Sequence, residues 1–195
     1  MPRELSLVIP TYNEAENVEE LIKRTALSLR NVDFEAIFVD DGSPDGTAMA
    51  VEWFGKAHGY FRVLRRKTKR GLSSAVMDGV RIAKGDIVAV MDGDLQHPPE
   101  LLPKMLGEIR LGHDLVIASR YMKSGIGEHS DLLRKEISKV AILLVHLLLP
   151  KTRKVEDAVS GFFMFRKSVL KMPDLGLSVT RFFLKSSNKV MLITR

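Results

Sequence analysis

The chain of 195 residues contains no cysteine. This absence excludes disulfide-stapled scaffolds, thiolate zinc sites, iron–sulfur clusters and cysteine nucleophiles. Any metal bound by the chain must therefore use oxygen or nitrogen ligands. The lack of cysteine also agrees with a reducing compartment.

Long hydrophobic runs are missing as well. The longest run covers residues 140–149, half of the roughly 20 residues that a helix needs to span a bilayer. The apolar stretch near the N-terminus, Leu5–Ile9, is too short for the core of a signal peptide. We therefore expect a cytoplasmic chain without a transmembrane helix.

Familiar phosphate-binding motifs are also absent. The sequence has neither G-x-x-x-x-G-K-[ST] nor G-x-G-x-x-G, so P-loop and dinucleotide-cofactor functions have no motif to support them. The five histidines are scattered without the spacing of metal ligands. We expect these histidines to be structural or surface residues.

The charge balance is positive, with 30 Lys and Arg against 24 Asp and Glu and a net charge of +6. An anionic partner is therefore expected, which leaves nucleic acid, a phosphate-bearing substrate or an acidic membrane surface. Residues 62–70 hold six basic residues and no acidic one. Because no aromatic residues are interleaved to stack on bases, we expect no nucleic-acid binding. The stretch favours a solvated charged face, with anion binding at a site edge as the alternative.

Short apolar runs rich in β-branched residues alternate with segments of helical length. The runs predict strands over Leu5–Pro10, Glu35–Asp40, Arg62–Arg66, Asp86–Asp92 and Asp114–Ser119. The intervening segments predict helices over Glu16–Leu29 with Asn13 as cap, Thr47–Ala57, Ser73–Ala83 and Pro99–Leu111. This order predicts an α/β fold, a mainly parallel sheet with helices on both faces. Ligands bind such sheets at the carboxyl ends of the strands.

Polar clusters follow four of the predicted strands, at residues 10–14, 40–47, 92–99 and 120–121. The carboxyl ends of parallel strands meet at one edge of a sheet, so we expect these clusters to converge. Each cluster alone has a simpler explanation as turn or helix-cap chemistry. Crowded carboxylates, however, repel one another unless a cation or hydrogen-bond donors hold them. Convergence therefore favours a binding site.

The cluster after the fourth strand has the composition of a metal site. Only Gly93 separates Asp92 from Asp94, so a tight turn can direct both carboxylates toward one hard divalent cation. The amide oxygen of Gln96 is a candidate third ligand. So few protein ligands leave coordination positions open for a diphosphate substrate. The sequence therefore predicts Mg²⁺ or Mn²⁺ as a cofactor.

Residues 131–154 break the alternation of strands and helices. This region contains the most apolar segment of the chain and carries six basic residues against two acidic ones, a net charge of 6 − 2 = +4. The combination indicates a helix at a lipid interface. A buried core helix with solvated ends is the alternative.

Six motifs follow one another along the chain: V-I-P-T-Y-N-E (8–14), V-D-D-G-S-P-D-G-T (39–47), G-L-S-S-A-V-M-D-G (71–79), D-G-D-L-Q-H-P-P-E (92–100), S-R-Y (119–121) and D-A-V-S-G-F-F (157–163). In this order they resemble the family 2 glycosyltransferases, which have the Rossmann-like GT-A fold. Within that family they are most similar to dolichyl-phosphate mannosyltransferases of the archaeal type. The similarity covers roughly residues 5–170.

The resemblance implies roles for individual residues. It implies a nucleotide pocket formed by Pro10, Tyr12, Glu14, Val39, Asp41, Asp92 and Gly93, in which Asp41 contacts the base or ribose. It implies a metal site at Asp92, Asp94 and Gln96. Arg120 and Arg134 resemble the cations that bind the diphosphate and the acceptor phosphate, and Asp157 and Ser160 resemble the start of the acceptor-lining motif.

The resemblance also implies an activity, the transfer of mannose from GDP-mannose to dolichyl phosphate with inversion. Residues 131–154 would then hold a polyprenyl phosphate at the membrane surface, to which the protein would be peripheral. A transferase that uses a UDP-sugar is one alternative, and a catalytically impaired remnant that binds only nucleotide or membrane is another. The catalytic domain is expected over residues 1–173. Residues 174–195 lack the family's later motifs and are expected to be an atypical tail, truncated or frameshifted.

Overall fold

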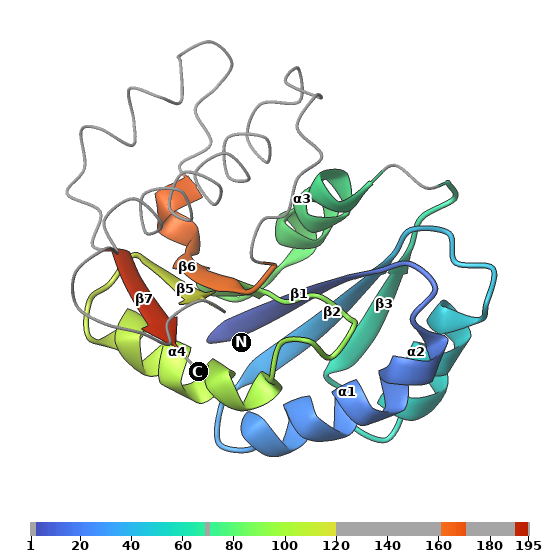
Figure 1. Ribbon diagram of the computed structural model, residues 1–195, viewed down its shortest axis with the longest axis horizontal. Coiled ribbons are helices and arrows are strands. Elements are labelled where there is room, and N and C mark those ends of the chain that lie inside the picture. The colour runs from blue at the N-terminus through green and yellow to red at the C-terminus, as the bar shows by residue number, and fades with distance from the viewer. Residues whose placement is uncertain (1–2, 69–70, 120–160, 171–189, 195) are drawn as a thin grey trace, which may run out of the picture.

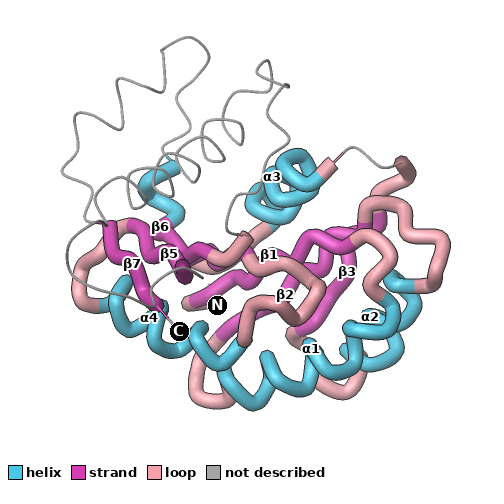
Figure 2. The backbone as a smooth tube through the Cα atoms, in the orientation of Figure 1, coloured by secondary structure: helices cyan, strands magenta, loops and turns pink. Residues whose placement is uncertain are grey.

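A computed structural model describes residues 3–68, 71–119, 161–170 and 190–194. These residues form one seven-stranded sheet in the order β3-β2-β1-β4-β6-β5-β7. Of the α-helices, α3 lies on one face of the sheet, and α1, α2 and α4 lie on the other (Figure 1). The helices on both sides of the strands are also visible in Figure 2. The predicted α/β architecture is confirmed.

The sheet is mainly parallel, as predicted. Its strands are β1 (Leu5–Thr11), β2 (Phe34–Asp40), β3 (Phe61–Arg65), β4 (Ile87–Val90), β5 (Leu115–Ser119), β6 (Phe163–Arg166) and β7 (Val190–Thr194). The neighbours β3, β2, β1 and β4 are parallel, and so are β5 and β7. The exception is β6, which runs antiparallel between β4 and β5.

Two of these strands were not predicted from the sequence. The strand β6 begins at the last residue of the motif D-A-V-S-G-F-F, and β7 falls in the expected tail and forms the edge of the same sheet. The proposed domain boundary at residue 173 stays a prediction. The described part of the expected tail nevertheless contributes a strand to the central sheet.

The helices are α1 (Ala15–Ser28), α2 (Thr47–Gly55), α3 (Leu72–Ile82) and α4 (Leu102–Arg110), with short 3-10 helices η1 (Pro99–Leu101) and η2 (Lys167–Leu170). All seven residues of β1 are buried because both faces of the sheet are covered. Alternate residues pack on opposite faces: Leu7 belongs to the cluster on the α1 side, and Val8 belongs to the cluster under α3. The near-continuous apolar strands in the sequence reflect this double burial.

The start of α1 differs from the prediction. Asn13 was expected to cap this helix, but Glu14 holds the N-cap position without a side-chain hydrogen bond, and Asn13 has a φ of 59°. The loop after β2 satisfies the backbone donors instead. Ala15 N donates to Asp45 Oδ2 (3.0 Å), and Glu14 N donates to Thr47 Oγ1 (2.9 Å). The helix is therefore capped by side chains thirty or more residues away in sequence.

The buried carboxylate of Glu35 connects β2 to β1, to β3 and to Lys84 just beyond the end of α3. Glu35 accepts hydrogen bonds from Ser6 Oγ (2.7 Å) and Lys84 N (2.6 Å), and it forms an ion pair with Arg62 (3.0 Å). Burial raises the pKa of Glu35, but these donors and the Arg62 charge outweigh it and hold the pKa below its usual value. Arg62 is thus a partner of Glu35.

Candidate active site

Two aspartate-rich segments follow neighbouring parts of the sheet. We call residues 40–47, after β2, the β2 loop, and residues 92–97, after β4, the β4 turn. The strands β2 and β4 both pair in parallel with β1, so their carboxyl ends lie at one edge of the sheet on either side of β1. The predicted convergence of these clusters is confirmed for the segments after β1, β2 and β4.

The β4 turn holds the predicted metal ligands. Asp94 Oδ1 accepts a hydrogen bond from Gln96 N (3.0 Å), which closes the turn, and Leu95 between them has a φ of 59°. A non-glycine residue in this left-handed region is uncommon and is typical of strained functional loops. Asp92 is 27% exposed and Gln96 is exposed. The turn therefore presents carboxylate and amide groups at the sheet edge.

The donor set fits a hard divalent cation that retains open coordination positions. In the described ranges, no three His, Cys, Asp or Glu side chains gather closely enough to form a closed metal site. Magnesium sites that carry substrate phosphates often use only one or two protein carboxylates. Two aspartates and one amide are consistent with such an open site.

Gly93 brings the β4 turn against the end of β1. A Cβ atom on Gly93 would lie 2.9 Å from Thr11 Cγ2, too close for any residue but glycine without a shift. The neighbouring Thr11 Oγ1 is buried and has no hydrogen-bond partner within the described residues. Buried polar atoms are rarely left unpaired, so Thr11 is a candidate contact for a ligand at this edge.

Two residues beside Asp92 were not singled out in the sequence. Val90 pairs with Phe163 in the antiparallel ladder, and continuing this register by two residues sets Gly161 opposite Asp92. His97 is 3% exposed, and its Nε2 lies 4.0 Å from Asp92 Oδ2. The signals were present in the motifs around residues 92–100 and 157–163, but the pairing of β4 with β6 was needed to connect them.

The predicted nucleotide residues surround the end of β1. Pro10 pairs with Val39 in the ladder, and Val39 is fully buried beneath α3. Tyr12 is 38% exposed, and Glu14 Oε2 accepts a hydrogen bond from Asn17 Nδ2 (2.6 Å). Pro10 and Val39 therefore support the site from inside, and Tyr12 lies at its surface.

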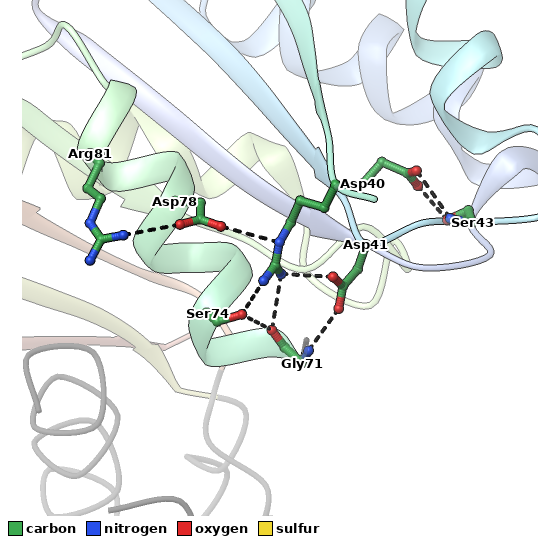
Figure 3. Close-up of polar contacts among 8 residues, drawn as sticks. Asp40, Asp41, Ser43, Gly71, Ser74, Asp78 and Arg81 are labelled. Carbon is green, nitrogen blue, oxygen red and sulfur yellow. Dashed lines mark hydrogen bonds and ion pairs between the residues drawn. The ribbon is translucent and has the colours of Figure 1, made fainter. Parts of the chain in front are cut away.

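Asp41, the predicted base or ribose contact, is held by a buried arginine. Arg66 Nη1 lies 2.8 Å from Asp41 Oδ1, and Gly71 N donates to Asp41 Oδ2 (2.9 Å). The same guanidinium donates to Ser74 Oγ and lies 3.3 Å from Asp78 Oδ2. We call Asp41, Arg66, Ser74 and Asp78 the Arg66 cluster. Figure 3 shows Asp41 and Asp78 on either side of the guanidinium in this cluster, with Ser74 on α3.

This cluster corrects one expectation. Residues 62–70 were expected to form a solvated charged face, but the side chain of Arg66 is only 2% exposed. An arginine is almost never fully buried without partners, and here two aspartates provide the negative charge. Arg66 thereby connects the end of β3 to the β2 loop and to α3.

The rest of the β2 loop is also held by hydrogen bonds within the protein. Ser43 N and Oγ both donate to Asp40, and Thr47 N donates to Asp45 Oδ1 (2.9 Å). Partial desolvation raises the pKa of Asp45, but hydrogen bonds from Thr47 and Ala15 outweigh it and hold the pKa below its usual value. The acids of the β2 loop thus act largely as structural acceptors.

Four of the predicted site residues lie outside the described residues: Arg120, Arg134, Asp157 and Ser160. The predicted interfacial region, residues 131–154, lies outside them too. Among the described helices, none combines the length and the hydropathy that a membrane span requires.

Comparison with known proteins places the chain in a family. Residues 6–172 match the model of Glycosyl transferase family 2. Over 171 residues the chain is 46% identical to a dolichol-phosphate mannosyltransferase of Pyrococcus furiosus. The alignment covers 88% of this chain and 48% of the relative. Over 175 residues it is 34% identical to the dolichol-phosphate mannosyltransferase of Saccharomyces cerevisiae, and that alignment covers 88% of this chain and 64% of the relative. The chain thus spans about half to two thirds of the length of these relatives.

Solved structures share the fold at low sequence identity. A glucosyl-3-phosphoglycerate synthase of Mycobacterium tuberculosis in complex with UDP has a TM-score of 0.64 and 22% identity, covering 98% of this chain and 70% of its own. A mannosyltransferase of Pyrobaculum calidifontis in complex with GDP-mannose and Mn²⁺ has a TM-score of 0.64 and 18% identity, covering 100% and 57%. These likenesses agree with the GT-A fold expected from the motifs. Together with the match over residues 6–172, the sheet and the β4 turn lead to one conclusion: the chain belongs to glycosyl transferase family 2.

Proposed function

We propose that this protein transfers mannose from GDP-mannose to a polyprenyl phosphate such as dolichyl phosphate, with inversion at the anomeric carbon and with Mg²⁺ or Mn²⁺ as cofactor. The observation that carries the proposal is the β4 turn, in which Asp92, Asp94 and Gln96 lie at the carboxyl end of a buried central strand. The 46% identity to a dolichol-phosphate mannosyltransferase supports the choice of donor and acceptor.

The β4 turn would hold the metal through Asp92, Asp94 and Gln96. When bound, the ion would neutralise the negative charge that develops on the departing diphosphate. Mn²⁺ and Mg²⁺ both suit oxygen ligands, and the Mn²⁺ in the Pyrobaculum calidifontis mannosyltransferase makes Mn²⁺ the better first choice for experiments.

The nucleotide would lie across the ends of β1 and β2. The exposed Tyr12 and the buried Asp41 would contact the nucleoside, and Glu14 and Gly93 would border the pocket. Because Arg66 and Gly71 N already bind Asp41, its carboxylate keeps a fixed orientation before the donor arrives. Such preorganisation lowers the cost of binding.

The acceptor requires little activation. A phosphate monoester has a second pKa near roughly 6 and is an anion at neutral pH, so it needs less help from a general base than a sugar hydroxyl does. The main task is to hold two anions together, for which we propose Arg120 and Arg134, with Asp157 and Ser160 on the acceptor side. The basic, apolar residues 131–154 would bind the lipid phosphate at a membrane surface.

The test is a transfer assay with Mn²⁺, radiolabelled GDP-mannose and a polyprenyl phosphate in detergent. A mannosylated lipid is expected from the wild-type protein, and Asp92→Ala should lose at least about 100-fold in rate because a metal ligand is removed. Undiminished activity in Asp92→Ala would contradict the metal role. A thermal shift with UDP and Mn²⁺ but not with GDP and Mn²⁺ would favour a UDP-sugar donor instead. Binding of GDP without any turnover would favour an impaired remnant.

A further inference from the structure

A glycine two residues before β6 lies directly against the β4 turn. A Cβ atom built on Gly161 would overlap with all three heavy atoms of the Asp92 carboxylate group. The main chain at residue 161 therefore lies directly against the predicted metal ligand. No side chain, not even that of alanine, fits at this position while Asp92 keeps its present orientation.

The backbone that follows Gly161 is held in the sheet. The strand β6 is hydrogen-bonded to β4 and to β5, and Ala118 N donates to Phe162 O (3.0 Å). Phe162 is fully buried, and its ring lies 5.3 Å from the buried His97 ring between centroids. Interiors packed in this way transmit strain instead of absorbing it. Because β6 is paired on both edges, we expect a group added at residue 161 to displace Asp92.

We propose that Gly161 is a positioning residue that sets the orientation of the Asp92 carboxylate, with Phe162 and His97 as its rigid support. The inference rests on the proposed function in one respect, because Asp92 is taken as a metal ligand. The steric contact between residue 161 and Asp92 does not depend on the proposed function. We infer that residue 161 acts on the site only through Asp92.

The first experiment compares Gly161→Ala with Gly107→Ala. Gly107 lies in α4, where a Cβ atom would meet nothing within 4 Å, so it provides a matched control for adding one methyl group. Mn²⁺ affinity is measured by electron paramagnetic resonance in the presence of GDP. We expect Gly161→Ala to bind Mn²⁺ at least about tenfold more weakly, because Asp92 no longer faces the ion. Gly107→Ala should bind Mn²⁺ as the wild type does. Equal affinity in wild type and Gly161→Ala overturns the inference.

The second experiment combines Gly161→Ala with Asp92→Ala in a thermal-melting cycle. Asp92→Ala removes the atoms that the new methyl group would meet, so Gly161→Ala should lower the melting temperature in the wild-type background and leave it almost unchanged in the Asp92→Ala background. Recovery of folding in the double variant, if Gly161→Ala alone does not fold, supports the inference equally. An equal loss in both backgrounds overturns it, because the methyl group would then act on something other than Asp92.

The two experiments also separate this inference from the proposed function. A wild-type protein that binds no Mn²⁺ contradicts the proposed metal site. The melting cycle requires no metal, so it decides in that case whether Gly161 acts through Asp92.

Discussion

The β2 loop and the β4 turn are both rich in aspartate and both follow central parallel strands, but the protein holds their carboxylates in different ways. In the β2 loop, Asp41 has a guanidinium and a backbone amide as partners, and its side chain is 6% exposed. In the β4 turn, the 27% exposed Asp92 is placed by contact with the main chain of Gly161. Aspartates in similar motifs are therefore held by internal partners in the β2 loop and stay partly exposed in the β4 turn, where the proposed metal would bind.

The largest effect on stability should come from the buried cation of the β2 loop. Arg66→Met removes the guanidinium that pairs with Asp41 and Asp78 in a largely buried cluster, and we expect the free energy of unfolding to fall by about 3–5 kcal/mol. Urea unfolding measures it. The control is Arg65→Met, because the Arg65 pair with Glu52 is exposed and should contribute less than about 1 kcal/mol. Equal losses in the two variants would break the comparison.

The opposite pattern is expected for the β4 turn. Asp94→Asn keeps the size of the side chain and one oxygen that can close the turn with Gln96 N, but it removes a charged metal ligand. Transfer activity should fall by about 100-fold or more, while the free energy of unfolding changes by less than about 1 kcal/mol. The readouts are the mannosyl-transfer rate and urea unfolding of the same preparation. A large loss of stability with full activity would assign Asp94 to the fold.

A smaller effect is expected where the β2 loop caps α1. Asp45→Ala removes the acceptor for Ala15 N and Thr47 N, and we expect a loss of about 1 kcal/mol in urea unfolding. Asp33→Ala is a suitable control, because Asp33 forms an exposed ion pair with Arg3. Asp45→Asn, which retains one acceptor oxygen, should recover part of the lost stability. A neutral Asp45→Ala would mean that water satisfies these donors as well as Asp45 does.

The smallest expected effect is the pH dependence of the stability that Asp45 contributes. The pKa of Asp45 is lower in the folded protein than its usual value, so its contribution is present above that usual value and is lost as the pH falls through the folded pKa. Wild type should therefore lose its advantage over Asp45→Asn as the pH is lowered from about 5 toward 2. Glu35 titrates in the same direction in both proteins and cancels in the difference. A difference that does not vary with pH would contradict this account.

Much of the fold was predictable because local sequence carried it. The strands β1, β2 and β4 are buried on both faces, so their Val and Ile runs are legible without tertiary information. The strand β6 is short and lies between β4 and β5, and residues 120–162 separate it from β5 along the chain. The apolar run at residues 162–165 is only four residues long, and a run of this length does not by itself distinguish a strand from a buried helical segment. The edge strand β7 is likewise defined by its pairing with β5.

The site was predictable where composition defines it and not where distant residues meet. The β4 turn was singled out because two aspartates around one glycine suit a hard cation, and the structure places this turn at the expected edge of the sheet. The burial of Arg66 could not be predicted, because its partners Asp41 and Asp78 come from other elements and the surrounding basic residues favour solvent. The contact between Gly161 and Asp92 requires the antiparallel register of β4 with β6. In each case the missing information was a contact between elements that are separate in the sequence.

We expect the carboxylates of the β4 turn to bind a divalent cation, whereas Asp40 and Asp45 of the β2 loop serve the fold. The most direct test is a Mn²⁺ titration followed by electron paramagnetic resonance with GDP present, on wild type, Asp92→Asn and Asp45→Asn. We expect wild type and Asp45→Asn to bind Mn²⁺ with similar affinity and Asp92→Asn to lose at least about tenfold. Unchanged Mn²⁺ affinity in Asp92→Asn, or an equal loss in Asp45→Asn, would contradict the claim.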